Sequence, residues 1–138
     1  MLRSNSKPSC LSMLALAVVL LFPATTYASA PLTDANITNA IVGEASDCPY
    51  VVKRGIASAI RNRKTLKGVY GFNARHIWHE PQRVWVDARR ACRESHKADT
   101  VRGARYFGSA RDVAKGTFFG LSFVCVLGNS NHLVYFFK

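Results

Sequence analysis

Acidic side chains are scarce in this sequence, which has 8 Asp and Glu against 19 Lys and Arg and a net charge of +11. Such a cationic surplus attracts polyanions, namely nucleic acid, anionic lipid or the acidic polymers of a bacterial envelope. A basic surface that serves only solubility is the alternative interpretation. Any reaction that needs a carboxylate must draw on a short set: Asp34, Glu44, Asp47, Glu80, Asp87, Glu94, Asp99 and Asp112.

Metal-binding patterns are also missing. The four cysteines form no C-x-x-C pair and no cluster with histidine, which argues against a structural zinc site. His76 and His79 have the spacing of two ligands on a helix, but no third ligand pattern lies nearby, so we expect neither a metal nor another cofactor. In an oxidising compartment Cys48, Cys92 and Cys125 allow one disulfide, and the pairs Cys48–Cys92 and Cys92–Cys125 are both open.

The apolar run at residues 11–22 is too short for an ordinary membrane-spanning helix. Arg3 and Lys7 precede it, and Pro23 ends it before a group of small residues, which is the pattern of a secretory signal peptide. We expect cleavage after Ala28, so that residues 1–28 are the signal and residues 29–138 form one domain without a stable membrane anchor. Loss of Arg3 and Lys7 lowers the net charge from +11 to +9. The expected location is secreted or periplasmic, which favours an envelope polymer over nucleic acid.

The spacing of apolar residues predicts helices first and strands afterwards. Helices are expected at residues 34–45, 49–63 and 80–95, with an ordered loop at residues 64–79. Short runs of β-branched and aromatic residues predict strands at residues 104–107, 121–127 and 132–137, the last two joined as a hairpin. We therefore expect an α+β fold, with a three-helix N-terminal part and a small C-terminal antiparallel hairpin or sheet.

The sequence around the second helix leads to three further predictions. Asp47 is expected to cap its N-terminus, with Pro49 in its first turn. Lys53 is expected on the outer face, opposite the apolar residues. Gly55 would mark a close approach of another helix.

Glu44 lies on the apolar side of the first helix. Ile37, Ala40, Ile41 and Ala45 form a stripe at helical spacing, and Glu44 follows Ile37 by seven residues. A glutamate that faces a core either pairs with a cation or keeps its proton, and cleavage of a glycosidic bond needs such a protonated acid. The alternative is a rotated helix whose Glu44 is solvated.

Aromatic residues alternate with polar ones in the loop at residues 64–79. Tyr70, Phe72 and Trp78 stand among Asn73, glycines and histidines, an arrangement that stacks on sugar rings or bases. The alternative is that these rings close the edge of a small core.

Together these motifs resemble the SleB-type cell-wall hydrolase family, the spore cortex-lytic enzymes and their bacterial and phage relatives. The resemblance spans residues 37–136, and no single motif is specific; the order and spacing carry it. The motifs are Val42-Gly43-Glu44-Ala45, the ASAIRNR run that ends at Arg63, Leu66-Lys67-Gly68-Val69-Tyr70-Gly71, Val84-Trp85 with Ala88 and Ala91, Gly103-Ala104 before Tyr106-Phe107, and Asn131-His132 with Val134-Tyr135. Residues 46–49 and the short, basic residues 108–120 depart from the family's pattern.

The resemblance implies cleavage of peptidoglycan glycan strands in a lysozyme-like cleft between a helical part and a small β part. Position by position, it implies Glu44 as the catalytic acid. It also implies the cleft-lining residues Tyr70, Asn73, Tyr106, His132 and Tyr135. Asn62 and Arg63 would orient the cleft wall or the glutamate helix. A monomer that acts on peptidoglycan is expected.

The mechanism depends on whether a second carboxylate is present, because hydrolytic glycosidases usually use two. None stands out from the sequence, which favours a lytic transglycosylase in which Glu44 is both acid and base. Hydrolysis by Glu44 with Asp47 is the nearest rival. A non-catalytic cationic binder of envelope polymer or nucleic acid is an alternative of a different class, and a ribonuclease that pairs His76 or His79 with His132 is a third.

Overall fold

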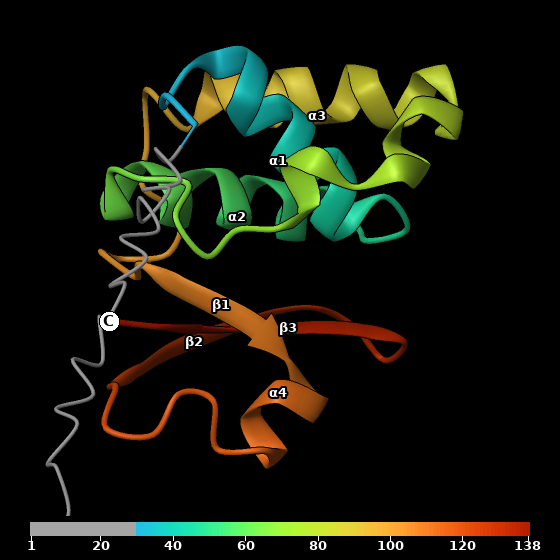
Figure 1. The fold of residues 1–138 in the computed structure, drawn as a ribbon. Coiled ribbons are helices and arrows are strands. Elements are labelled where there is room, and N and C mark those ends of the chain that lie inside the picture. The colour runs from blue at the N-terminus through green and yellow to red at the C-terminus, as the bar shows by residue number, and fades with distance from the viewer. Residues whose placement is uncertain (1–29) are drawn as a thin grey trace, which may run out of the picture.

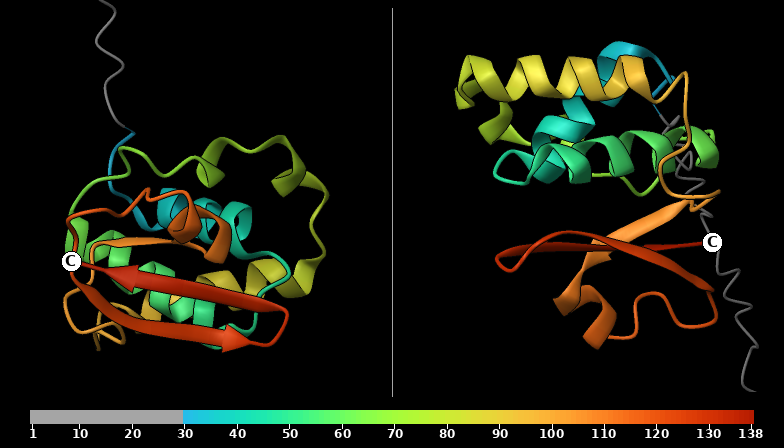
Figure 2. Two further views of the ribbon diagram at one scale, coloured as in Figure 1. Left: turned by 90° about the horizontal axis from the view of Figure 1, so that it is seen from below. Right: turned by 180° about the vertical axis from the view of Figure 1, so that it is seen from behind.

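The computed structural model describes residues 30–138, so the expected signal peptide and its cleavage site after Ala28 lie outside the described residues. Figure 1 shows a group of helices on one side and a small sheet on the other, and the view from behind in Figure 2 shows the same two layers. This arrangement confirms the α+β prediction. The elements in chain order are α1 (Asp34–Ala45), α2 (Tyr50–Arg63), η1 (Gly71–Asn73), η2 (Arg75–His79), α3 (Gln82–Glu94), β1 (Tyr106–Ser109), α4 (Ala110–Ala114), β2 (Phe123–Asn129) and β3 (His132–Phe137).

Helix α1 forms where the apolar periodicity placed it. The Thr33 hydroxyl accepts the Asn36 N–H at 3.2 Å and so satisfies one of the free amides of the first turn. The predicted stripe is confirmed, since Ile37, Ala40 and Ile41 are fully buried. The last turn of this helix presents Glu44 at the boundary between the helices and the sheet.

The structure of α2 differs from all three expectations for this helix. Pro49, not Asp47, occupies the N-cap position, and no side chain caps the helix. The side chain of Lys53 is only 4% exposed, and its Nζ lies 3.7 Å from Asp87 of α3, because α2 packs against α3. Gly55 faces the sheet, where a Cβ would lie 2.6 Å from Leu127 and 2.7 Å from Phe136. The missing side chain therefore allows a helix–sheet approach instead of a helix–helix one.

The sheet has three antiparallel strands in the order β1-β3-β2. The expected hairpin is confirmed as β2 and β3, joined at Ser130-Asn131, and β1 begins two residues later than predicted. Phe136 on β3 is fully buried against α2, so one face of the sheet completes the helical core. Helix α4 was not predicted; in Figure 1 it lies below the sheet, on the side away from α2.

Among residues 30–138, no helix has the length and hydrophobicity needed to cross a membrane. The three cysteines in this range, Cys48, Cys92 and Cys125, are free thiols, so neither open disulfide pair is formed. Cys92 is buried, and burial raises the pKa of its thiol.

Candidate active site

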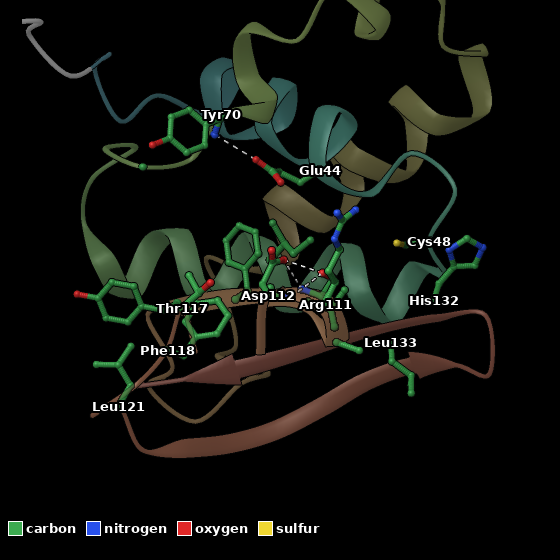
Figure 3. A pocket seen from close by; sticks show the side chains of 18 of the residues that line it. Glu44, Cys48, Tyr70, Arg111, Asp112, Thr117, Phe118, Leu121, His132 and Leu133 are labelled. Atoms are coloured by element: carbon green, nitrogen blue, oxygen red, sulfur yellow. Dashed lines mark hydrogen bonds between the residues drawn. The ribbon is translucent and has the colours of Figure 1, made fainter. Parts of the chain in front are cut away.

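A cleft of about 1010 Å³ runs along the boundary between the helices and the sheet (Figure 3). The helical side contributes the end of α1, part of α2 and the loop that follows it. The other side contributes β1, α4, the loop after α4 and the beginning of β3. The cleft is therefore built from segments far apart in the sequence, and its lining includes Glu44, Arg63, Tyr70, Tyr106, Arg111, Asp112, Phe118, Phe119, His132 and Leu133.

Glu44 enters this cleft from the last turn of α1. Its Oε1 atom accepts the backbone N–H groups of Gly71 at 2.7 Å and of Tyr70 at 3.1 Å. Oε2 accepts no hydrogen bond from any described residue. The side chain is exposed, which corrects the expectation that it is buried on the apolar stripe. The orientation of α1 buries Ile41 and Ala45 in the core and directs Glu44 into the cleft.

Two glycines create the room for this arrangement. A Cβ atom on Gly43 would collide with the carbonyl group of Gly71, and a Cβ on Gly71 would lie 2.7 Å from Cγ of Glu44. The loop after α2 therefore packs directly on the backbone of α1. The close approach brings two amide groups to one carboxylate oxygen.

Four of the six predicted site residues line the cleft, namely Glu44, Tyr70, Tyr106 and His132. Tyr70 is 82% exposed. The guanidinium of Arg63 lies 4.9 Å from the ring centroid of Tyr106. This cation–π contact joins α2 to β1, and Arg63 also lines the cleft.

Asn73 and Tyr135 do not line the cleft. Asn73 is exposed in η1. Tyr135 lies on the face of β3 opposite Phe136, with its ring 6.5 Å from that of Phe123, because successive side chains of a strand point to opposite faces. The resemblance assigned both positions, and the strand register separates Tyr135 from the site.

The other residues that the sequence suggested for a functional site do not line the cleft. Asn62 holds the turn before β1 through bonds to Asp99 and to the carbonyl group of Ala104. His76 and His79 lie in η2 outside the cleft lining, so neither is placed beside His132. Within residues 30–138 no three His, Cys, Asp or Glu side chains gather as metal ligands would.

The residues that sequence reasoning missed come from α4 and the loop after it. Arg111 and Asp112 line the cleft on the wall opposite Glu44 (Figure 3). A capping box starts α4, with Ser109 and Asp112 as reciprocal partners. The spacing Ser-x-x-Asp was the available signal for this helix start. Phe119, 96% exposed, follows in the loop.

Asp47, the second carboxylate of the rival mechanism, does not line the cleft that holds Glu44. It lines a separate hollow with Lys53, Glu80 and Asp87. The structure therefore does not pair Glu44 with Asp47.

No protein-family model matches this chain, and no curated protein matches its sequence. Among solved structures it is similar to the catalytic domain of the germination-specific lytic transglycosylase SleB from Bacillus anthracis, at 21% identity and a TM-score of 0.55. The match covers 76% of this chain and 93% of that domain. The chain thus has a SleB-like fold, with helices and a small antiparallel sheet.

Proposed function

We propose that this protein cleaves peptidoglycan glycan strands at the β-1,4 bond between N-acetylmuramic acid and N-acetylglucosamine, as a lytic transglycosylase. The observation that carries the proposal is Glu44, whose Oε1 is fixed by two backbone amides in an open cleft. The likeness to a lytic transglycosylase domain supports it. We infer membership of the SleB-type cell-wall hydrolase family, export of a single domain at residues 29–138 and action as a monomer.

In this mechanism Glu44 acts first as an acid. Its free Oε2 donates a proton to the glycosidic oxygen as the bond from that oxygen to C1 breaks. The 6-hydroxyl of the same muramyl sugar then bonds to C1, and Glu44 takes up the proton of that hydroxyl. The product carries a 1,6-anhydro ring, and no water is consumed. Acid–base help of this kind contributes about 10² to 10⁴ in rate.

The exposure of Glu44 in the free protein is compatible with this role. A glycan strand bound in the cleft covers the carboxyl group and removes water from around it, which strengthens every electrostatic interaction there. The exposed ring of Tyr70 on one wall offers a flat surface for a sugar ring. Phe119 offers another on the opposite wall.

The decisive test is digestion of purified sacculi followed by mass analysis of the released muropeptides. Anhydro ends are expected from the wild-type protein. Glu44→Gln keeps the acceptor oxygen but cannot donate a proton, so release should fall at least about 10²-fold while the fold persists. Glu80→Gln, the same change outside the cleft, should digest as the wild type does. Reducing ends would contradict the transglycosylase mechanism, and intact strands would contradict the function.

The exposed basic face of α3 favours the second candidate, a non-catalytic cationic binder. Arg83, Arg89 and Arg93 are all exposed along this helix. A binder of this kind would be indifferent to Glu44→Gln. It would also bind DNA and sacculi equally well, with the strong salt dependence of a polyanion contact.

A further inference from the structure

The cleft contains a second carboxylate, Asp112, which no motif along the chain marked as part of the site. These two are the acidic side chains of the cleft lining within residues 30–138. They belong to opposite walls, Glu44 to the end of α1 and Asp112 to the first turn of α4 (Figure 3). A glycan strand that runs along the cleft therefore passes both carboxylates.

The carboxylate of Asp112 is held in a fixed orientation. Its Oδ2 accepts the backbone N–H of Ser109 at 2.9 Å and the Ser109 hydroxyl at 2.7 Å. The Asp112 N–H donates in turn to the Ser109 hydroxyl oxygen at 3.3 Å. Oδ1 accepts no hydrogen bond from a described residue. One oxygen therefore anchors the group, and the other is available to a ligand.

Asp112 also remains charged. The hydrogen bonds from the side chain and the backbone of Ser109 hold the pKa of this carboxyl below its ordinary value of 3.8, and the positive charges of Lys115 and Arg111 lower it further. At neutral and mildly acidic pH the group is an anion. A fixed anion stabilises positive charge that develops near it, without any reorganisation at the moment of reaction.

We propose that Asp112 is a second catalytic residue, whose anion stabilises the positive charge on the anomeric carbon while Glu44 protonates the glycosidic oxygen. The inference rests on the proposed function. Asp112 forms no bond to the sugar in this scheme. Closure by the 6-hydroxyl is unchanged, so the product remains the anhydro sugar. The site then combines the two carboxylates typical of glycosidases with the chemistry of a transglycosylase.

The test is a variant that removes the negative charge of Asp112 but keeps the hydrogen bonds of the capping box at the start of α4. Asp112→Asn retains an oxygen that accepts the Ser109 N–H and hydroxyl. We expect kcat on sacculi to fall about 10²-fold with KM within a factor of about three, since the lost interaction belongs to the transition state. The melting temperature should change by only a few degrees, and the product should stay anhydro. Asp47→Asn, an equal change of charge outside the cleft, should leave kcat unaltered.

Ser109→Ala distinguishes loss of the Asp112 charge from loss of the helix cap, because it removes the capping hydroxyl but leaves the Asp112 carboxylate in place. It should lower the melting temperature more than Asp112→Asn does and reduce kcat less. Wild-type kcat in Asp112→Asn would overturn the role of Asp112, and so would equal losses of kcat in both variants. Reducing ends that disappear in Asp112→Asn would also overturn it, since Asp112 would then activate water. A wild-type protein that releases nothing from sacculi contradicts instead the proposed function.

Discussion

At the scale of single residues, the position of Glu44 depends on the absence of two side chains. Gly43 and Gly71 let the loop after α2 touch the backbone of α1, and this contact aims the N–H groups of Tyr70 and Gly71 at Oε1. Neither glycine needs its conformational freedom here, because neither has a positive φ. What the site requires is the space that a Cβ would occupy.

We predict that Gly71→Ala impairs catalysis more than stability. The new Cβ would lie 2.7 Å from Cγ of Glu44 and 2.8 Å from its backbone nitrogen, so the loop must move. Overpacking of this kind costs about 1–3 kcal/mol of unfolding free energy. A displacement of about 1 Å at a catalytic group costs roughly 10²-fold in kcat. Urea unfolding and muropeptide release measure the two effects.

Gly103→Ala is the matched control for this prediction. Gly103 has a φ of +82° and no atom within 4 Å of a built Cβ. Alanine there should cost about 1 kcal/mol through backbone strain alone. Its kcat should equal that of the wild type. A Gly71→Ala protein with full activity would show that the two amides do not position Glu44.

At the scale of elements, α2 lies between the other two long helices and the sheet, because it contacts α1 and α3 as well as β1 and β2. Gly55 packs on the sheet, Lys53 forms an ion pair with α3, and Arg63 lies on the ring of Tyr106 in β1. These residues lie on different faces of one helix. The angle between the two walls of the cleft is therefore set by contacts of α2.

The Lys53–Asp87 pair should be asymmetric in its effect on stability. Lys53 is buried, whereas the Asp87 side chain is 44% exposed. Asp87→Ala leaves a buried ammonium without this partner, and we expect a loss of about 1–3 kcal/mol in unfolding free energy. Lys53→Met replaces the ammonium by an apolar group of similar length and should cost less than about 1 kcal/mol. Urea unfolding of each variant measures the difference.

The double variant Lys53→Met/Asp87→Ala completes the cycle. It should be more stable than Asp87→Ala alone, because no buried charge is left without its partner. Asp47 and Glu80 line the same hollow and provide the remaining negative charge near Lys53. If Asp87→Ala were as stable as the wild type, these two carboxylates would be sufficient partners for Lys53.

At the scale of the whole molecule, positive charge far exceeds negative charge, with 19 Lys and Arg against 8 Asp and Glu. Much of this excess is unpaired and exposed, as on the outer face of α3. A surface of this kind attracts an anionic wall from a distance, independently of the contacts within the cleft.

We predict that binding to sacculi weakens with salt. The Glu44→Gln protein is the form to measure, because it should leave the substrate intact. If contact with the wall releases two counterions, affinity should fall about tenfold between about 50 and 200 mM salt. Binding of a neutral chitin oligosaccharide should change little over the same range. If the affinities for sacculi and for the chitin oligosaccharide fell equally with salt, the cationic residues responsible would lie inside the cleft and not on the outer surface.

Local patterns along the chain predicted most of the helices and strands and the α+β class. Apolar residues at helical spacing placed α1 correctly, and β-branched and aromatic runs followed by a polar turn placed the β2–β3 hairpin. These signals are local, because each depends on the period of a single element. The segment at residues 108–120 carried only a short capping signal, so α4 was missed.

The complete lining of the cleft follows from the tertiary fold. Glu44, Tyr70, Tyr106, Asp112 and His132 converge from five separate segments. The family resemblance anticipated four of these residues, but no motif along the chain marked Asp112 as part of the site. Helical periodicity is also too coarse to separate a buried position from one at the edge of the core, which is why Glu44 was expected to be buried and Lys53 to be exposed. Burial depends on what packs against a helix, and in this protein the loop after α2, the sheet and α3 decide it.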